Sequence, residues 1–542
     1  MLPLIPLLIL LLGVGALALG FLPRFERTDV VASAAVLLAL VALGLLPPLQ
    51  LLPVGATLSA WGPPALLPLA LTLLLDPLSW VFGMGILTLT LATLLTGVAR
   101  PGGRRLFIRG AMLLLAFAGL AAVFSDNLLT IILAWAGLDL IYFIVLVVLG
   151  QSEGVELQAV LNLAFNAAGT LLAIGAALLI SRESPGLSLR EAALTSRSTL
   201  LITLAAVFRL GLFPLHLALP AEANIRQGLG TVLRLIPAAV ALCVMARLAS
   251  FGFTPTARLW LTIFALGAAL VGAAQLWMIE DPRLGITYFV IAESGVVLLA
   301  GLWGGALALT AQSVALMLGG ALIFLTCGHD SQRPWLTALP AVGGLAVMGA
   351  PFTAGWDGAA SLLQALIGGG HWLILAGLMI AQTILAAGLF HTIFWPGELS
   401  EEAPGQLVFY LVGLALPVAG LALMDWLGAA WIRSAQIAGS AQIAGSAQIA
   451  VPATGIWGLV AVAVSISAGL AMWRFESVAR GPASGAVGAL SALFRVGWLY
   501  RLVWSGVHFL ETLVFNLAAV LEGEGAVLWV LVAFVVLLLV LR

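Results

Sequence analysis

The chain has 542 residues, of which 63% are hydrophobic and only 8% are charged. Soluble domains usually carry about 25% charged residues, so this composition excludes a water-soluble protein, and it excludes a disordered chain as well. The net charge of −1 leaves no basic surface for nucleic acid, and the two cysteines, Cys243 and Cys327, are too few for a disulfide framework or a zinc or iron–sulfur site.

Apolar runs long enough to cross a bilayer recur along the chain. A helical span needs about 20 apolar residues, and helices are expected because lipid cannot hydrogen-bond to an open backbone. We predict an all-α integral membrane protein with about 16 spans. They lie at residues 4–21, 30–53, 77–98, 107–124, 128–150, 156–180, 199–219, 228–250, 257–279, 284–303, 305–327, 335–353, 359–395, 407–430, 454–473 and 525–541.

The basic residues indicate an orientation. All 22 of them are arginines. If the spans alternate, most loop arginines fall on one side of the membrane, and cytoplasmic loops are enriched in basic residues. We therefore expect the N-terminus to lie outside.

The C-terminal part is organised differently from the rest. Residues 434–450 read SAQIAG-SAQIAG-SAQIA, which predicts a linker on the outer side, with an interface in the helix bundle as the alternative. Residues 484–522 place polar side chains three or four apart, which favours an amphipathic helix along the membrane surface over a loop plus part of a span. These polar residues are Arg501, Ser505, His508, Thr512 and Asn516. We expect a core at 1–430, a linker at 431–453 and a C-terminal part at 454–542.

Few ionisable or amide side chains fall inside the spans. Such groups are costly in lipid and usually face a bundle interior or a water-filled path. Nearby prolines, Pro214 and Pro237, predict interrupted helices, which transporters use to bind ions. The alternative is a set of fixed ion pairs, such as Asp139 with Arg209, that hold helices together. The candidate proton path or polar axis comprises Asp139, Arg209, His216, Arg234, Glu293, Gln312 and Asp357.

Six motifs in order resemble the antiporter-like membrane subunits of respiratory complex I and of Mrp-type sodium/proton antiporters. They span roughly residues 70–430. They read LDPLSWVF at 75–82, WAGLDLIYF at 135–143, RLGLFPLHLALPAE at 209–222, DPRLGITYFVIAESG at 281–295, GALIFLTCG at 320–328 and GAPFTAGW at 349–356.

The resemblance implies a specific architecture and location. It implies about 14 core helices in inverted repeats, with broken helices at 199–219 and 305–327. A C-terminal amphipathic helix and a final anchoring helix follow. It also implies a bacterial inner membrane and partner membrane subunits, with lipids around the bundle.

The resemblance further implies proton transfer along buried Glu, Lys and His residues, most of which are replaced here. The family's first glutamate falls on Ala136, with Asp139 one turn away. Its other relay positions fall on Arg209, near Leu233 and Ala239, and on Glu293, Gln312, Leu316, Gly320 and either Gly358 or Ala359. Arginine keeps its proton under protein conditions, so Arg209 preserves charge without the exchange that lysine allows.

Three hypotheses remain open from the residues. The chain is a membrane subunit of a complex I-like or related assembly that conducts protons or another cation by a rearranged path, or it is a non-conducting scaffold subunit. A third hypothesis is that it energises a peripheral enzyme, as similar subunits do in bicarbonate-uptake complexes. We expect at most a non-catalytic subunit of an NADH:quinone oxidoreductase-like complex. We expect no cofactor, metal or catalytic residue in the chain, since no phosphate loop, nucleophile–base pair or redox ligand set occurs.

Overall fold

The structure is a computed structural model of the chain. It describes residues 4–21, 28–47, 52–57, 70–98, 105–149, 155–181, 189, 194–212, 227–249, 253–328, 334–395, 404–439, 455–478, 480–481, 485, 504–506, 508–509, 511–513, 515–516 and 526–540.

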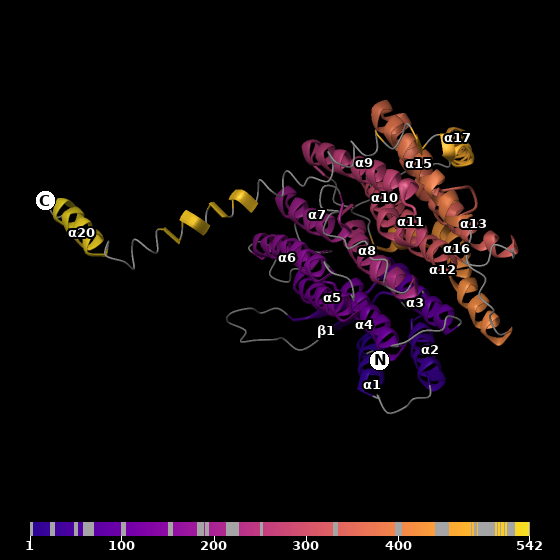
Figure 1. Ribbon diagram of the computed structural model, residues 1–542, viewed down its shortest axis with the longest axis horizontal. Coiled ribbons are helices and arrows are strands. Elements are labelled where there is room, and N and C mark those ends of the chain that lie inside the picture. Colours follow the sequence, from indigo (N-terminus) through magenta and orange to yellow (C-terminus); the bar gives the residue numbers. More distant parts are fainter. Residues whose placement is uncertain are drawn as a thin grey trace. The chain divides into compact units, whose positions relative to one another are not determined.

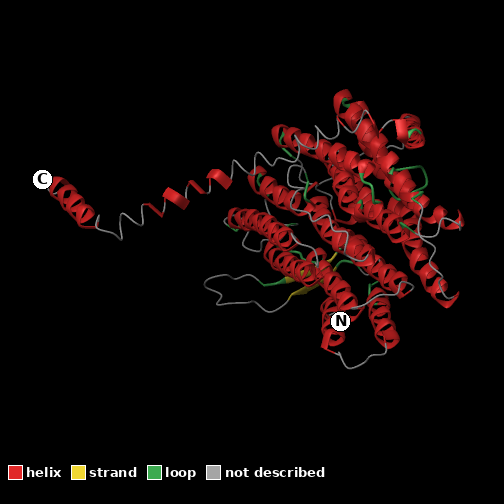
Figure 2. Ribbon diagram, viewed as in Figure 1, coloured by secondary structure: helices red, strands yellow, loops and turns green. Residues whose placement is uncertain are grey.

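Helices make up almost all of the described chain, as the apolar runs predict (Figure 1, Figure 2). The first half contains α1 Leu4–Phe21, α2 Thr28–Gly44, α3 Pro77–Val98, α4 Arg105–Val123, α5 Leu128–Leu149, α6 Val155–Ile180, α7 Ser196–Leu210, α8 Gln227–Ala249 and α9 Pro255–Met278. The second half contains α10 Ile286–Leu299, α11 Gly305–Val314, α12 Gly320–Thr326, α13 Ala338–Val347, α14 Trp356–Gly368, α15 Trp372–Ile393, α16 Pro404–Gly439, α17 Gly455–Arg474 and α20 Ala526–Val540. Short 3-10 turns lie at Pro282–Leu284 and Pro334–Thr337, and π-helical turns lie at Ala300–Gly304 and Ala315–Gly319.

Polar residues at the boundaries explain where several helices begin. Thr254 caps α9 by accepting from the Ala257 N–H, and Pro255 follows at the first helical position. The Asp76 carboxylate accepts from Ser79 N–H at 2.8 Å, just before α3. The Ser79 hydroxyl in turn accepts from the Asp76 N–H at 2.8 Å. These reciprocal bonds satisfy backbone donors that the first helical turn leaves open.

The described helices include nine that are long and apolar enough to cross a membrane, and several shorter apolar ones. The all-α membrane architecture is therefore confirmed, while the number of 16 spans stays a prediction. Helices distant in sequence pack together, such as α3 with α16 and α9 with α15. The segment at residues 199–219 is interrupted as expected, because α7 ends at Leu210. The interruption expected at Pro237 is wrong, because α8 continues through that proline from Gln227 to Ala249.

The expected break inside residues 305–327 is wrong. From Ala306 to Thr326 the backbone stays helical, with one π-helical turn at Ala315–Gly319 in place of a break. Gly305, at φ 86°, precedes this run. A true interruption lies further on, where α13 ends at Val347 and α14 begins at Trp356. The physical reason is local, because residues 348–355 contain two left-handed positions, Gly349 at φ 64° and Phe352 at φ 62°, which a continuous right-handed helix does not accept.

Two further details differ from the predicted spans. The predicted single span at 359–395 is two helices, α14 and α15, separated by Gly370 at φ 70°. A small antiparallel hairpin, β1 Val54–Thr57 with β2 Thr72–Leu75, occupies part of the region after α2. Its register pairs Val54 with Leu75 and Thr57 with Thr72.

The described chain forms two compact units, Met1–Val487 and Gly488–Arg542. In the first unit, α16 continues as a helix to Gly439, into the first copy of the SAQIAG repeat, and α17 packs on α15. The rest of the repeat lies outside the described residues, and the linker stays a prediction. In the second unit, the described residues between 504 and 516 are helical, and Ser505, His508, Thr512 and Asn516 are exposed. Arg501 lies outside the described residues.

Candidate functional site

A buried ion pair joins α5 to α7. Arg209 donates from Nη1 to one oxygen of Asp139 and from Nη2 to the other, both at 2.7 Å. Nη2 also donates to the Thr170 hydroxyl on α6 at 3.0 Å. Both charged side chains are buried. Paired N–H donors on two carboxylate oxygens form the strongest geometry available to an arginine, so this contact ties three helices together.

Aromatic rings line the same region. The Arg209 guanidinium carbon lies 4.2 Å from the centroid of the Trp135 ring, one turn before Asp139 on α5. Arg234 on α8 donates to the hydroxyl of Tyr142 on α5, and its guanidinium carbon lies 5.9 Å from that ring. Stacking on a π face stabilises a desolvated cation, so neutral groups hold both arginines, and the charge of Asp139 holds Arg209 as well.

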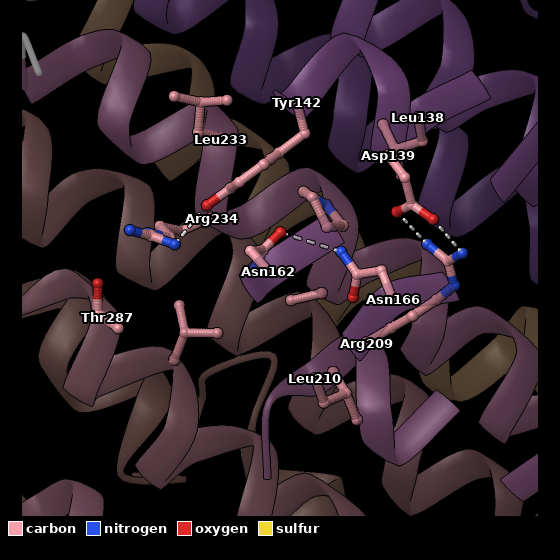
Figure 3. Close-up of a pocket in the computed structure, with 13 residues that line it drawn as sticks. Leu138, Asp139, Tyr142, Asn162, Asn166, Arg209, Leu210, Leu233, Arg234 and Thr287 are labelled. Carbon is pink, nitrogen blue, oxygen red and sulfur yellow. Dashed lines mark hydrogen bonds and ion pairs between the residues drawn. The ribbon is translucent and has the colours of Figure 1, made fainter. Parts of the chain in front are cut away.

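A small cavity of about 30 Å³, lined by charged, amide and apolar side chains, lies beside the ion pair (Figure 3). A water molecule needs roughly 10–15 Å³ of such space and two to four polar partners, so the cavity can hold water. Asn166 donates to Asn162 at 3.1 Å on its α6 wall. The residues that line the cavity are Leu138, Asp139, Tyr142, Asn162, Asn166, Arg209, Leu210, Leu233, Arg234, Pro237, Ala238, Thr287 and Val290.

The end of α7 places Arg209 at this cavity. Gly211 adopts the left-handed conformation at φ 60°, which ends the helix one residue after Leu210. The Gly211 N–H donates to the Phe208 carbonyl, and the Leu212 N–H donates to the Val207 carbonyl. Arg209 therefore lies in the last turn, where the helix dipole favours a cation.

A second polar cluster lies in the other half of the first unit. Gln312 on α11 donates from Nε2 to Glu293 Oε1 on α10 at 2.6 Å, and to the Val347 carbonyl at the end of α13 at 2.7 Å. Glu293 is fully buried. Oε2 of Glu293 and Oε1 of Gln312 have no hydrogen-bond partner among the described residues.

Apolar groups occupy the relay positions near the two clusters. A Cβ atom on Gly320 would lie 2.6 Å from the ring of Phe289, so Phe289 fills the space that a side chain at 320 would need. Ala239 and Leu316 are fully buried. Ala136 is exposed, whereas Asp139 three residues later is buried, so the acidic group of α5 is on the inner side.

The described residues contain no group of three or more His, Cys, Asp or Glu that could hold a metal ion. His216 lies outside the described residues. Asp357 is exposed in the first turn of α14 and so does not belong to either buried cluster.

We compared the chain with known proteins. No family model matches it. NADH-quinone oxidoreductase subunit N 1 of Symbiobacterium thermophilum is 28% identical over 208 residues, which is 33% of this chain and 42% of that protein. The match therefore spans less than half the length of that curated relative.

Solved structures match over most of the chain. A chain of the Mrp complex from Dietzia sp. aligns with a TM-score of 0.78 at 19% identity, covering 99% of this chain and 63% of that one. A chain of Thermus thermophilus respiratory complex I with bound NADH aligns at 0.67 and 22% identity, covering 82% of this chain and 100% of that one. A chain of the membrane-bound sulfane sulfur reductase, an archaeal respiratory membrane complex, gives 0.67 and 19%, covering 99% and 100%.

This chain has the fold of the antiporter-like membrane subunits. The resemblance predicted from the six motifs is thereby confirmed, and the chain is a multi-pass membrane protein similar to subunits of multisubunit membrane complexes.

Within this antiporter-like fold, the structure groups the predicted polar residues in two sets. Asp139, Arg209 and Arg234 lie around the cavity, whereas Glu293 and Gln312 form the second cluster.

Sequence reasoning missed Thr170 and Tyr142, which contact the two arginines. The signal was present, because Thr170 follows Asn162 and Asn166 at intervals of four and Tyr142 follows Asp139 by three, which places each on the face of its neighbours.

A third cluster lies where α9, α15 and α17 end. Arg480 forms an ion pair with Glu476 and donates to the Trp277 carbonyl at 2.6 Å. His391 Nδ1 lies 3.3 Å from the Glu476 carboxylate. These contacts hold the residues after α17 against α9 and α15. No spacing in the sequence predicts this pairing, because the partners lie far apart along the chain.

Proposed function

We propose that this chain is a membrane subunit of a multisubunit complex related to complex I and to Mrp-type antiporters, in a bacterial inner membrane with its N-terminus outside. Within that complex it translocates protons or another cation along a polar axis that is rearranged relative to the family. The observation that carries the proposal is the buried cluster of Asp139, Arg209 and Arg234 around a water-sized cavity, at the point where α7 is interrupted.

Energetic cost supports a functional role for this cluster. Charged groups inside a membrane are rare because lipid solvates them poorly, and they usually mark ion pathways. Interrupted helices at membrane depth occur where they line a cavity or are buried in protein. Here the interruption at Gly211, the charges and the cavity coincide.

A second candidate function, a non-conducting scaffold, is favoured by two specific observations. Arg209 engages both oxygens of Asp139, which is the geometry of a static pair. Phe289 fills the space beside Gly320, where the resemblance implies a titratable lysine. In a scaffold, the pair would serve only to hold α5, α6 and α7 together.

Removing the ion pair as a unit separates the two functions. The double variant Asp139→Leu/Arg209→Met leaves no orphan charge, and such replacements are often neutral for stability. We expect the complex to assemble with this variant but to lose proton uptake in reconstituted vesicles. The matched control is Glu156→Gln, an exposed carboxylate in the first turn of α6 and outside both clusters, which should leave uptake unchanged.

Unchanged proton uptake by the assembled double variant would instead establish the scaffold function. Co-purification identifies the partners in the same preparation. Membrane subunits alone are expected, whereas a tightly bound soluble enzyme would support the energising role.

A further inference from the structure

The described helices around Glu293 enclose its side chain. Its helix, α10, packs on α9 at two glycines, where helix backbones approach closely. A Cβ atom on Gly272 would lie 2.8 Å from the Tyr288 carbonyl oxygen, and one on Gly295 would lie 2.8 Å from the Ala269 nitrogen. The carboxyl group between these contacts is therefore shielded from lipid on the α9 side, and its exposed fraction is 0%.

The hydrogen bonds of Gln312 determine its orientation. Its Nε2 faces two acceptors, the Glu293 carboxyl and the Val347 carbonyl, so the amide cannot be turned without placing oxygen against oxygen. Glu293 Oε1 is consequently an acceptor, and the open atom is Oε2.

No basic side chain forms an ion pair with Glu293 in the described part of the chain. This differs from Asp139, both of whose oxygens accept from Arg209. An unpaired carboxylate in an apolar interior has a large desolvation cost, and one proton on Oε2 removes that charge. A hydronium ion can donate that proton and leave as water, and release is the reverse reaction.

Gln312 also connects Glu293 to the second helix interruption. Val347 is the last residue of α13, and residues 348–355 separate it from α14. On the other side, a Cβ atom on Gly358 of α14 would lie 3.2 Å from the backbone nitrogen of Gln312. Gln312 thus lies where α10, α11, α13 and α14 meet, and its Nε2 is shared between the carboxyl group and the interrupted backbone.

We propose that Glu293 is an exchangeable proton-binding site, and that Gln312 couples its charge to the interruption between α13 and α14. Loss of the proton strengthens Oε1 as an acceptor for one N–H of Gln312 Nε2 and pulls the amide toward Glu293, which weakens the bond from its other N–H to the Val347 carbonyl. That the bound proton is the transported ion rests on the proposed function. That Glu293 binds a proton does not depend on it.

Difference infrared spectroscopy of the purified complex tests the site directly. The wild-type spectrum minus that of Glu293→Gln is expected to contain the carbonyl stretch of a protonated carboxyl group. In Gln312→Leu, which removes the hydrogen bond to Oε1, this band is expected to shift to higher frequency. Dicyclohexylcarbodiimide, which reacts with protonated carboxyls in apolar surroundings, is the chemical probe, and it should modify Glu293 and spare Asp139.

Three results would overturn the assignment. The first is a difference spectrum with only carboxylate bands, and the second is a carbonyl band that Gln312→Leu does not shift. The third is protection of Glu293 from the carbodiimide by sodium ions, which would indicate a metal-cation site. Proton uptake by reconstituted complex is measured separately. A protonated Glu293 whose loss leaves uptake unchanged would confirm the site and show that its proton is not the transported ion.

Discussion

At the scale of single residues, the two buried carboxyl groups differ in their partners. Asp139 has both oxygens engaged by an arginine that also contacts Trp135 and Thr170. Glu293 has a neutral amide as its partner among the described residues. Because an ion pair stabilises ionised groups and a lone amide compensates charge poorly, Asp139 suits a fixed charge in the polar axis, and Glu293 suits binding and release of a proton.

The single substitution Asp139→Asn is expected to destabilise the protein by about 3–5 kcal/mol, since it leaves Arg209 buried without a counter-charge. Thermal unfolding can be followed with a thiol-reactive dye, because both native cysteines are buried and react only on unfolding. Asp139→Leu/Arg209→Met should recover most of the stability. A double variant as unstable as Asp139→Asn would show that the ion pair is not the source of the loss.

At the scale of helices, close packing at glycines builds the walls of the second cluster. Gly272 and Gly295 bring α9 against α10, and Gly358 brings α14 against α11. The resemblance implies a late lysine or glutamate at Gly358 or Ala359, and a side chain at Gly358 would have its Cβ only 2.7 Å from the Ala308 carbonyl oxygen. Helix packing and the loss of that relay residue therefore have one physical cause, which is the short distance between the two backbones.

The substitution Gly295→Ala should destabilise the protein by about 1–3 kcal/mol, because the added methyl group meets the backbone of α9 and the helices must separate. Gly137→Ala is the matched control, since no atom lies within 4 Å of its Cβ position in α5. The free energy of unfolding of Gly137→Ala should rise by about 0.5–1 kcal/mol, because alanine has a higher helix propensity than glycine. Equal effects of the two substitutions on the unfolding temperature would contradict the packing argument.

At the scale of the whole molecule, the orientation predicted from arginine placement can be measured with impermeant maleimide. Ser181, at the end of α6, and Arg283, after α9, are both exposed and are expected on opposite sides of the membrane. In intact cells, Ser181→Cys should react and Arg283→Cys should not, and Arg283→Cys should react once the membrane is opened. The parent protein provides the background because both native cysteines are buried. Reaction of Arg283→Cys alone in intact cells would place the N-terminus inside.

The sequence by itself determined most helix positions. The predicted runs at 77–98 and 128–150 became α3 at Pro77–Val98 and α5 at Leu128–Leu149, because a long apolar segment in lipid has to satisfy its backbone internally. The motifs likewise predicted the antiporter-like fold, since spaced motifs survive when overall identity is near 20%. The interruption near Arg209 was predicted from Pro214, and the structure places the helix end at Gly211.

Only the tertiary structure decided how the polar residues are used. Sequence spacing could place Asp139 and Arg209 on helices, but the contact joins residues 70 apart, and nothing local determines which helix faces meet. The same holds for the bond from Gln312 to Val347 and for the Phe289 ring beside Gly320. Local sequence determines which segments are helical, whereas partners depend on how whole helices pack, because helix interfaces form between residues that are distant along the chain.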